Sequence, residues 1–267
     1  RSSMTSNAID GDAAELSVQF TFKPSAVELS ASEEERLRTL GLERRSGVPG
    51  LYLLRALDRQ GNHEPVVPAE EIKLEGELKV KAERLRDELA AHLKEKGTEG
   101  LPKDLYGNFD LMGAWLSGAD LRLAQLQKAG LYKAQLQKAI LNRAQLQKAD
   151  LRNAQLQEAK LYRAQLQGAN LGWAQLQKAN LRGAQLQEAK IPEAHLQKAD
   201  LTTAQLQKAD LTKAQLQGAN LEQANLEGAK LVDANLACAA FPSADLTKAD
   251  LNGVIERMPK HKPPRPP

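Results

Sequence analysis

The strongest constraint on this 267-residue chain is a five-residue period that runs without a break over residues 109–253. Every fifth position from Leu111 to Leu251 is apolar, and 27 of these 29 positions are Leu. The position two residues before the apolar one is Ala in every unit from Ala114 to Ala249. A pattern of this length specifies the architecture of more than half of the chain.

A period of five fits neither an α-helix nor a flat strand. On a helix, five residues advance about 500°, so successive Leu side chains would point about 140° apart and form no stripe. On a flat strand, every fifth residue would fall on the opposite face. The pattern instead favours short extended pieces separated by corners, with the Ala and Leu of each unit pointing inward. Four such units would close a coil of about twenty residues, and coils would stack about 4.8 Å apart.

The repeated unit resembles the pentapeptide-repeat family. The resemblance lies in tandem Ala-x-Leu-x-x units over residues 109–253, with Asp or Asn common before the Leu, as at Asp120, Asp150 and Asn170. It implies a mainly β fold, a right-handed quadrilateral β-helix of about seven coils. β-Solenoids host unrelated roles, so the resemblance specifies the fold more strongly than the function.

A second period, of ten residues, lies inside the first. From Ala124 to Gln217, Ala-Gln-Leu-Gln units alternate with variable units. Because ten residues are half a coil, the Gln side chains are predicted to form columns on two opposite faces, and the variable residues occupy the other two. Stacked amides can hydrogen-bond along such columns. One predicted column holds Gln125, Gln145, Gln165, Gln185 and Gln205, and the opposite one holds Gln135, Gln155, Gln175, His195 and Gln215.

The rest of the chain predicts a head and two tails. Residues 1–14 are small and polar and are expected to be a disordered or tethered terminus. Residues 15–97 are predicted to form a small α+β head that caps the rod, and residues 98–108 to link the two. Residues 254–267 are expected to close the rod and continue as a Pro-rich basic tail.

The head is predicted to combine strands with helices. Ser32 can cap a short helix whose first turn is acidic. A second helix has an apolar face and is predicted to end at Gly97. The predicted elements are a strand at 16–22, a helix at 32–40, a loop at 44–47, an element of either type at 51–57, a strand at 72–80 and a helix at 81–96.

Large side chains at outward positions of the repeat mark two candidate surfaces. Met112, Trp115 and Leu123 lie in the first units, so we expect them to contact the head. Further along the rod, aromatic and Arg side chains in variable units are candidates for binding a protein partner, because these residue types are enriched at interfaces. The candidate partner-binding residues are Tyr132, Arg152, Tyr162 and Trp173.

No motif in the sequence carries catalytic or cofactor chemistry. The four His residues share no spacing suited to a metal ion, and no phosphate-binding loop is present. Cys238 is the single cysteine, so no intramolecular disulfide can form. We therefore expect no enzyme activity, no cofactor and no metal. The lack of a long apolar run or signal peptide predicts no membrane association and a cytoplasmic location.

Three functions are compatible with the sequence. The first is a non-catalytic scaffold, a rigid β-solenoid that displays its outer faces to a protein partner or a larger assembly. The second, implied by the family resemblance, is a modulator of the topoisomerase gyrase that mimics DNA. The third is weak nucleic-acid binding through the basic N-terminal coils. An uncapped C-terminal end also leaves homo-oligomerisation open.

The charge of the rod favours the first of these functions. Residues 109–217 contain 15 Lys and Arg and 8 Asp and Glu, a net charge of +7. A surface that replaces duplex phosphates should be negative. Acidic residues also interrupt the basic columns, which argues against a nucleic-acid tract. The sequence therefore predicts a protein partner, whose identity it does not reveal.

Overall fold

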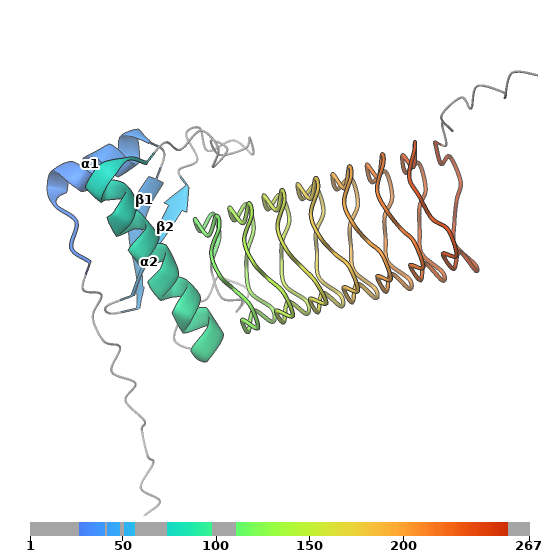
Figure 1. The fold of residues 1–267 in the computed structure, drawn as a ribbon, viewed down its shortest axis with the longest axis horizontal. Coiled ribbons are helices and arrows are strands. Elements are labelled where there is room, and N and C mark those ends of the chain that lie inside the picture. Colours follow the sequence, from blue (N-terminus) through green and yellow to red (C-terminus); the bar gives the residue numbers. More distant parts are fainter. Residues whose placement is uncertain (1–26, 41, 49–50, 57–73, 98–110, 256–267) are drawn as a thin grey trace, which may run out of the picture.

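In the part of the chain that the structure describes, a head with two helices and two strands lies at one end of a rod of stacked coils (Figure 1). The computed structural model describes residues 27–40, 42–48, 51–56, 74–97 and 111–255. Outside these described residues lie the predicted terminus 1–14, the predicted strand at 16–22, the linker 98–108 and most of the tail.

Each five-residue unit of the rod uses its backbone groups in the same way. The N–H of Leu161 donates to the carbonyl of Asn180 in the next coil, at 2.7 Å. The N–H of Ala164 turns back to the carbonyl of Leu161, at 2.9 Å, and closes a four-residue turn. The N–H of Gln165 donates to the carbonyl of Ala144 in the preceding coil, at 2.9 Å. Every coil is therefore hydrogen-bonded to both of its neighbours.

The pairing between coils is parallel and joins residues twenty positions apart, as at Gln145 and Gln165. The predicted twenty-residue coil is thus present. The extended pieces are shorter than expected, because a turn follows each of them within five residues. Over the described rod they form isolated bridges rather than strands.

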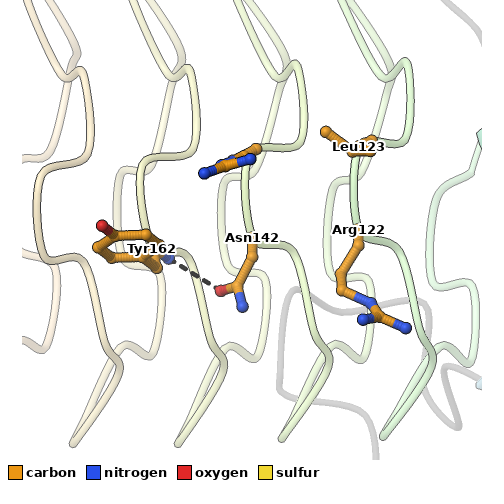
Figure 2. Close-up of a pocket in the computed structure, with 5 residues that line it drawn as sticks. Arg122, Leu123, Asn142 and Tyr162 are labelled. Carbon is orange, nitrogen blue, oxygen red and sulfur yellow. Dashed lines mark hydrogen bonds between the residues drawn. The ribbon is translucent and has the colours of Figure 1, made fainter.

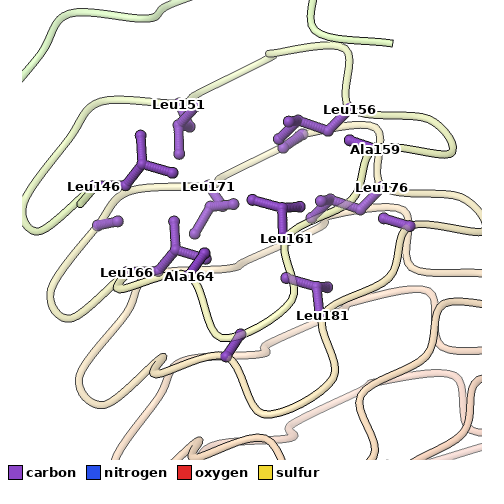
Figure 3. Packing of buried hydrophobic residues seen from close by; sticks show 14 of the residues in the cluster. Leu146, Leu151, Leu156, Ala159, Leu161, Ala164, Leu166, Leu171, Leu176 and Leu181 are labelled. Atoms are coloured by element: carbon purple, nitrogen blue, oxygen red, sulfur yellow. The ribbon is translucent and has the colours of Figure 1, made fainter. Parts of the chain in front are cut away.

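The interior of the rod is one continuous column of Leu and Ala. From Leu111 to Ala234 these inward side chains are at most 2% exposed. Figure 3 shows how they stack on one another from coil to coil. Small Ala beside large Leu fills a narrow interior at the density of a protein core, and burial of each Leu contributes about 2 kcal/mol.

The backbone of the turn explains why the residue before Leu is often Asp or Asn. The N–H two positions further on makes no bond between coils, and an Asp or Asn side chain accepts it. Asn180 accepts from the N–H of Arg182 at 3.1 Å, and Asp210 accepts from that of Thr212 at 3.1 Å. This local turn gives a hydrogen-bond acceptor to a backbone N–H that the bonds between coils leave unpaired.

The Gln columns lie where the sequence places them, and their side-chain amides are bonded in two ways. In the first coils an amide donates to the Gln of the next coil, as from Gln147 to Gln165 at 2.5 Å. In later coils it donates within its own unit, as from Gln207 to Gln205 at 3.0 Å. The predicted ladder along the rod is therefore only partly formed.

Helix α1 spans Ala31–Thr39, close to its predicted position. Its N-cap is Ser30 and not Ser32, because Ser30 and Glu33 form a reciprocal capping box. The adjacent Lys81 binds Glu33 at 2.9 Å. The hydrogen bond from the Ser30 N–H, which has the largest effect, and that from Lys81 lower the pKa of Glu33 to about 2.

Strand β1 spans Leu42–Val48 and pairs antiparallel with β2, Leu51–Ala56. The predicted loop at 44–47 is therefore wrong. Polar side chains suit a strand in a two-stranded sheet, because only one of its faces packs on a core. The ambiguous segment at 51–57 is resolved as a strand over most of its length.

Helix α2 spans Gly76–Glu95, so the predicted strand at 72–80 is wrong over most of its described part. The prediction rests on the alternation of apolar and polar residues in this segment. Leu78, Ala82 and Leu85 instead continue a helical spacing and are buried, whereas Val80 is half exposed. The helix predicted at 81–96 thus begins five residues earlier.

The head takes the place of a preceding coil at the N-terminal end of the rod (Figure 1). Leu89, Ala90 and Leu93 of α2 belong to the same buried cluster as the rod interior. The N–H of Gln125 donates to the carbonyl of Leu93, at 3.1 Å, where later units use the preceding coil. In the same way, the N–H of Trp115 donates to the carbonyl of Leu54 in β2, at 2.7 Å.

Gly97 brings the end of α2 close to the first coil. Its φ is +61°, and a Cβ there would lie 2.9 Å from Cβ and 3.0 Å from the carbonyl oxygen of Gln125. Gly is therefore required both by backbone conformation and by the close approach. Gly76, at the start of α2, has φ +60° but no heavy atom within 4 Å of a Cβ.

We predict that Leu161→Ala lowers the free energy of unfolding by about 2–5 kcal/mol, because it opens a cavity at a fully buried site. Urea unfolding followed by circular dichroism measures the change. The exposed Glu158 provides the control, and Glu158→Ala should stay within about 0.5 kcal/mol of wild type. Equal effects of the two substitutions would contradict the buried Leu column.

We also predict that Gly97→Ala destabilises the protein more than Gly76→Ala does. Both substitutions place a side chain at positive φ, at a cost of about 1–2 kcal/mol. Gly97→Ala adds a contact with the first coil, worth about 1–3 kcal/mol of further destabilisation. Thermal unfolding and hydrogen exchange of the Gln125 amide provide the readouts. If exchange of that amide is the same in both variants, the close approach does not hold the head on the rod.

Candidate functional site

The outward residues of the rod fall on four faces, two with Gln columns and two with variable residues. One variable face is concentrated in positive charge over its first four coils. We call it the arginine face and define it by residues 120–123, 140–143, 160–163 and 180–183. We call the other variable face, with residues 130–133, 150–153 and 170–173, the opposite face.

The arginine face carries five basic side chains and one carboxylate. The carboxylate is Asp120, which binds Arg122 in a bidentate ion pair, with N–O distances of 2.7 and 2.9 Å. It also contacts Lys94 of α2 at 3.2 Å. On this face, four of the basic residues make no ion pair within the described part of the chain: Arg143, Lys160, Arg163 and Arg182.

A shallow groove of about 260 Å³ runs along this face, and its walls come from three successive coils. Figure 2 shows Arg122, Asn142 and Tyr162 one after another along the rod, with Leu123 beside them. Leu123 is 61% exposed, although it is apolar. The lining residues are Arg122, Leu123, Asn142, Arg143 and Tyr162. The groove therefore combines two guanidinium groups with an aromatic ring and an exposed aliphatic side chain.

Tyr162 lies in the third of the three coils that line the groove, and its backbone holds it there. Residue 160 is Lys, so the local Asp or Asn acceptor of other units is missing. The N–H of Tyr162 donates instead to Oδ1 of Asn142 in the preceding coil, at 3.1 Å (Figure 2). The guanidinium of Arg163 lies 5.1 Å from the centre of the Tyr162 ring, a cation–π distance.

The N-terminal end of the groove is joined to the head by charged side chains. Hydrogen bonds from Arg122, with that from Lys94 in addition, hold the pKa of Asp120 well below its usual range. On the adjoining Gln face, Arg86 of α2 donates to the carbonyl of Ser117 at 3.0 Å and lies 5.6 Å from the Trp115 ring. The head is thus bound next to the groove, through Asp120 and through contacts on the adjoining face.

The four candidate partner-binding residues do not form one site. Tyr132, Arg152 and Trp173 lie on the opposite face, whereas Tyr162 lies on the arginine face. The reason is the twenty-residue coil: residues 132 and 152 share a column, but residue 162 is half a coil further on. Arg152 is bound to Asp150 at 2.7 Å and its guanidinium lies 5.6 Å from the Tyr132 ring.

The other candidates also differ in their surroundings. Trp173 is 48% exposed, whereas Tyr132 is partly buried and its neighbour Lys133 is buried. Of the three residues predicted to meet the head, Trp115 is 8% exposed and packs in the head cluster with Leu85. Met112 is 46% exposed, and Leu123 lines the groove.

Arg122 and Asn142 are not among the residues predicted from the sequence, and Arg143 belongs there only to the basic residues of the N-terminal coils. These residues are ordinary in isolation, since most outward positions of the rod are polar. Aligning the sequence at a period of twenty would have placed Arg143 beside Arg163 and shown that the charge gathers on one face.

Among the described residues, no group of three or more His, Cys, Asp or Glu side chains could hold a metal ion. Neither α1 nor α2, the helices that the structure describes, is long and apolar enough to cross a membrane.

The stacked coils, the Ala and Leu interior and the Asp or Asn turns define a β-solenoid of five-residue repeats. The family model of pentapeptide repeats (8 copies) matches residues 110–143, 144–183, 179–218 and 214–253. The chain therefore belongs to the pentapeptide-repeat family, and the resemblance found in the sequence is confirmed. The fold of this family is a right-handed β-helix.

The solved structures that are similar to the chain include three that illustrate the range. HetL from the cyanobacterium Nostoc sp. strain PCC 7120, a pentapeptide repeat protein involved in heterocyst differentiation regulation, is 30% identical over 53% of this chain and 84% of its own, with a TM-score of 0.29. Rfr23 from the cyanobacterium Cyanothece 51142 is 35% identical over 35% of this chain and 60% of its own, with a TM-score of 0.28. QnrB1, a plasmid-mediated fluoroquinolone resistance protein, is 22% identical over 54% of this chain and 77% of its own, with a TM-score of 0.33. No curated protein sequence matches the chain significantly.

The depressed pKa of Asp120 predicts that acid loosens the contact between head and rod. Its ionised form is favoured in the folded protein, so the stabilisation is complete above about pH 3.8 and is lost as the pH falls below it. We expect the protection factor of the Gln125 amide to fall about two- to fivefold between pH 6 and pH 2, since a partly exposed ion pair contributes up to about 1 kcal/mol. Hydrogen exchange with mass spectrometry measures it.

The matched control is Asp245, whose pKa is also lowered, by the Thr247 hydroxyl and N–H, but which lies at the far end of the rod. Asp120→Asn should give low protection of the Gln125 amide already at pH 6, and Asp245→Asn should behave as wild type. Wild-type protection in Asp120→Asn at pH 6 would show that this carboxylate does not hold the head.

Proposed function

We propose that the protein is a non-catalytic interaction scaffold, in which a rod of about seven coils, capped by an α+β head, presents its arginine face to a protein partner. The observation that carries this proposal is the group of basic side chains on that face that make no ion pair, placed beside Tyr162 and the exposed Leu123. Arg and aromatic side chains are the residue types most enriched at protein interfaces.

The rigidity of the rod supports this role. The backbone of each coil is bonded to the coils on both sides, and the inward side chains are buried, so the outward columns keep a fixed spacing. A surface that is ordered before binding loses less conformational entropy when a partner docks. The arrangement suits recognition better than catalysis, which needs a concave pocket with convergent reactive groups.

The charge of the rod argues against the hypothesis that the protein mimics DNA. Residues 111–255 contain 17 Lys and Arg against 12 Asp and Glu, and the four coils of the arginine face have five basic residues against one acidic residue. A mimic of duplex DNA needs the reverse. We therefore expect that rising concentrations of the protein leave DNA supercoiling by purified gyrase unchanged.

The proposed function is tested by immobilising the full-length protein and measuring the amount of each partner protein that it retains. We expect Arg143→Glu/Arg163→Glu to lose at least one bound protein that wild type retains, by about tenfold or more, because charged interface anchors contribute about 2 kcal/mol or more each. The control is Lys178→Glu/Lys198→Glu on a Gln face. It changes the charge by the same amount and also replaces residues at positive φ.

The comparison of the two variants decides the outcome. Retention of the same set of proteins by wild type and both variants would contradict a role for the arginine face. Equal loss in both variants would assign the interaction to net charge rather than to this face. Folding of each variant is checked by its far-ultraviolet circular dichroism and its thermal unfolding.

A further inference from the structure

We propose that the arginine face binds an acidic α-helix of the partner, laid along the rod with its carboxylates against successive coils. This inference rests on the proposed function and specifies the chemistry of the partner. It is carried by the spacing, charge and shape of the face.

The spacing of the basic side chains matches a helix better than an extended strand. Arg143, Arg163 and Arg182 come from three successive coils, which span about 10 Å at about 4.8 Å per coil. Carboxylates at positions i, i+4 and i+7 of a helix lie on one face and cover two turns, about 11 Å. Alternate side chains of a strand would cover about 13 Å over the same number of contacts. The flexible Arg side chains can compensate for the difference of about 1 Å between the span of the three Arg residues and that of the three carboxylates on a helix.

The charge of the face is available to such a partner. The basic residues beyond Arg122 make no ion pair within the described chain, and Arg143, Lys160, Arg163 and Arg182 are all exposed. Arg122 is already neutralised by Asp120, so it borders the site rather than drives binding. Guanidinium groups pair with carboxylates through two parallel hydrogen bonds, which adds geometric specificity to the attraction.

The extent of the face limits the length of the helix. Beyond residue 183 the same columns contain Asp200 and Glu222 instead of basic residues. These acidic residues would repel the carboxylates of a longer acidic helix. Leu123 in the first coil of the face and Tyr162 in the third offer an aliphatic and an aromatic surface for an apolar residue of the partner. The expected ligand is therefore a helix that contacts the face over about three turns, with three aligned carboxylates and one apolar side chain.

The test uses a fluorescein-labelled helical peptide of about 14 residues with a side-chain staple, Glu at i, i+4 and i+7, and one Leu beside this stripe. A second stapled peptide has the same composition with the Glu residues distributed around the helix. Fluorescence anisotropy measures binding to full-length protein. We expect micromolar affinity for the striped peptide and affinity weaker by about fivefold or more for the distributed one, because only the stripe faces the rod.

The two charge-reversal variants locate the site. Arg143→Glu/Arg163→Glu should weaken binding of the striped peptide by about tenfold or more, and Lys178→Glu/Lys198→Glu should change it by less than about twofold. Equal affinity for both peptides, equal effects of both variants, or tighter binding of a single-stranded oligonucleotide than of the striped peptide would each overturn the inference. If no peptide binds while partner capture still separates the two variants, the acidic helix is wrong and the scaffold function stands.

Discussion

The hydrogen bond from each central Leu N–H to the next coil is the interaction on which the rest of the structure depends. It repeats every five residues, and so does the reciprocal bond, from the N–H of the residue before each Leu to an Ala carbonyl of the preceding coil, which the first coil lacks. Carbonyls of Leu93 and Leu54 fill that role for the N–H groups of Gln125 and Trp115. The head therefore continues the hydrogen-bonding pattern of the rod, and its close fit at Gly97 follows from the same need.

The division between inward and outward positions separates folding from recognition. Ala and Leu point inward and determine the coil, so outward residues can vary without changing the architecture. The Gln columns are uniform, whereas the arginine face differs from coil to coil in charge and shape. A cluster of cations that make no ion pair does not stabilise the rod, because like charges in successive coils repel one another. The proposed binding role would account for it.

The period of five made the rod predictable, because neither a helix nor a strand can bury that pattern. The sequence is less informative about which candidate binding residues share a face, since Tyr132 and Tyr162 are both aromatic residues at outward positions. Only the twenty-residue coil shows that they lie on opposite faces. In the head, Leu74 and Leu78 fit alternation and helical spacing equally well, and the tertiary contacts of α2 decide between them. The capping carbonyl of Leu93 leaves no signal in the sequence.

The central claim is that recognition belongs to one face of the rod. Arginine-specific chemical modification, mapped by mass spectrometry with and without the bound partner or striped peptide, tests it most directly. Arg143, Arg163 and Arg182 should become protected on binding, and Arg152 on the opposite face should keep the reactivity it has in the free protein. Protection of Arg152 with no change at the other three would contradict the account.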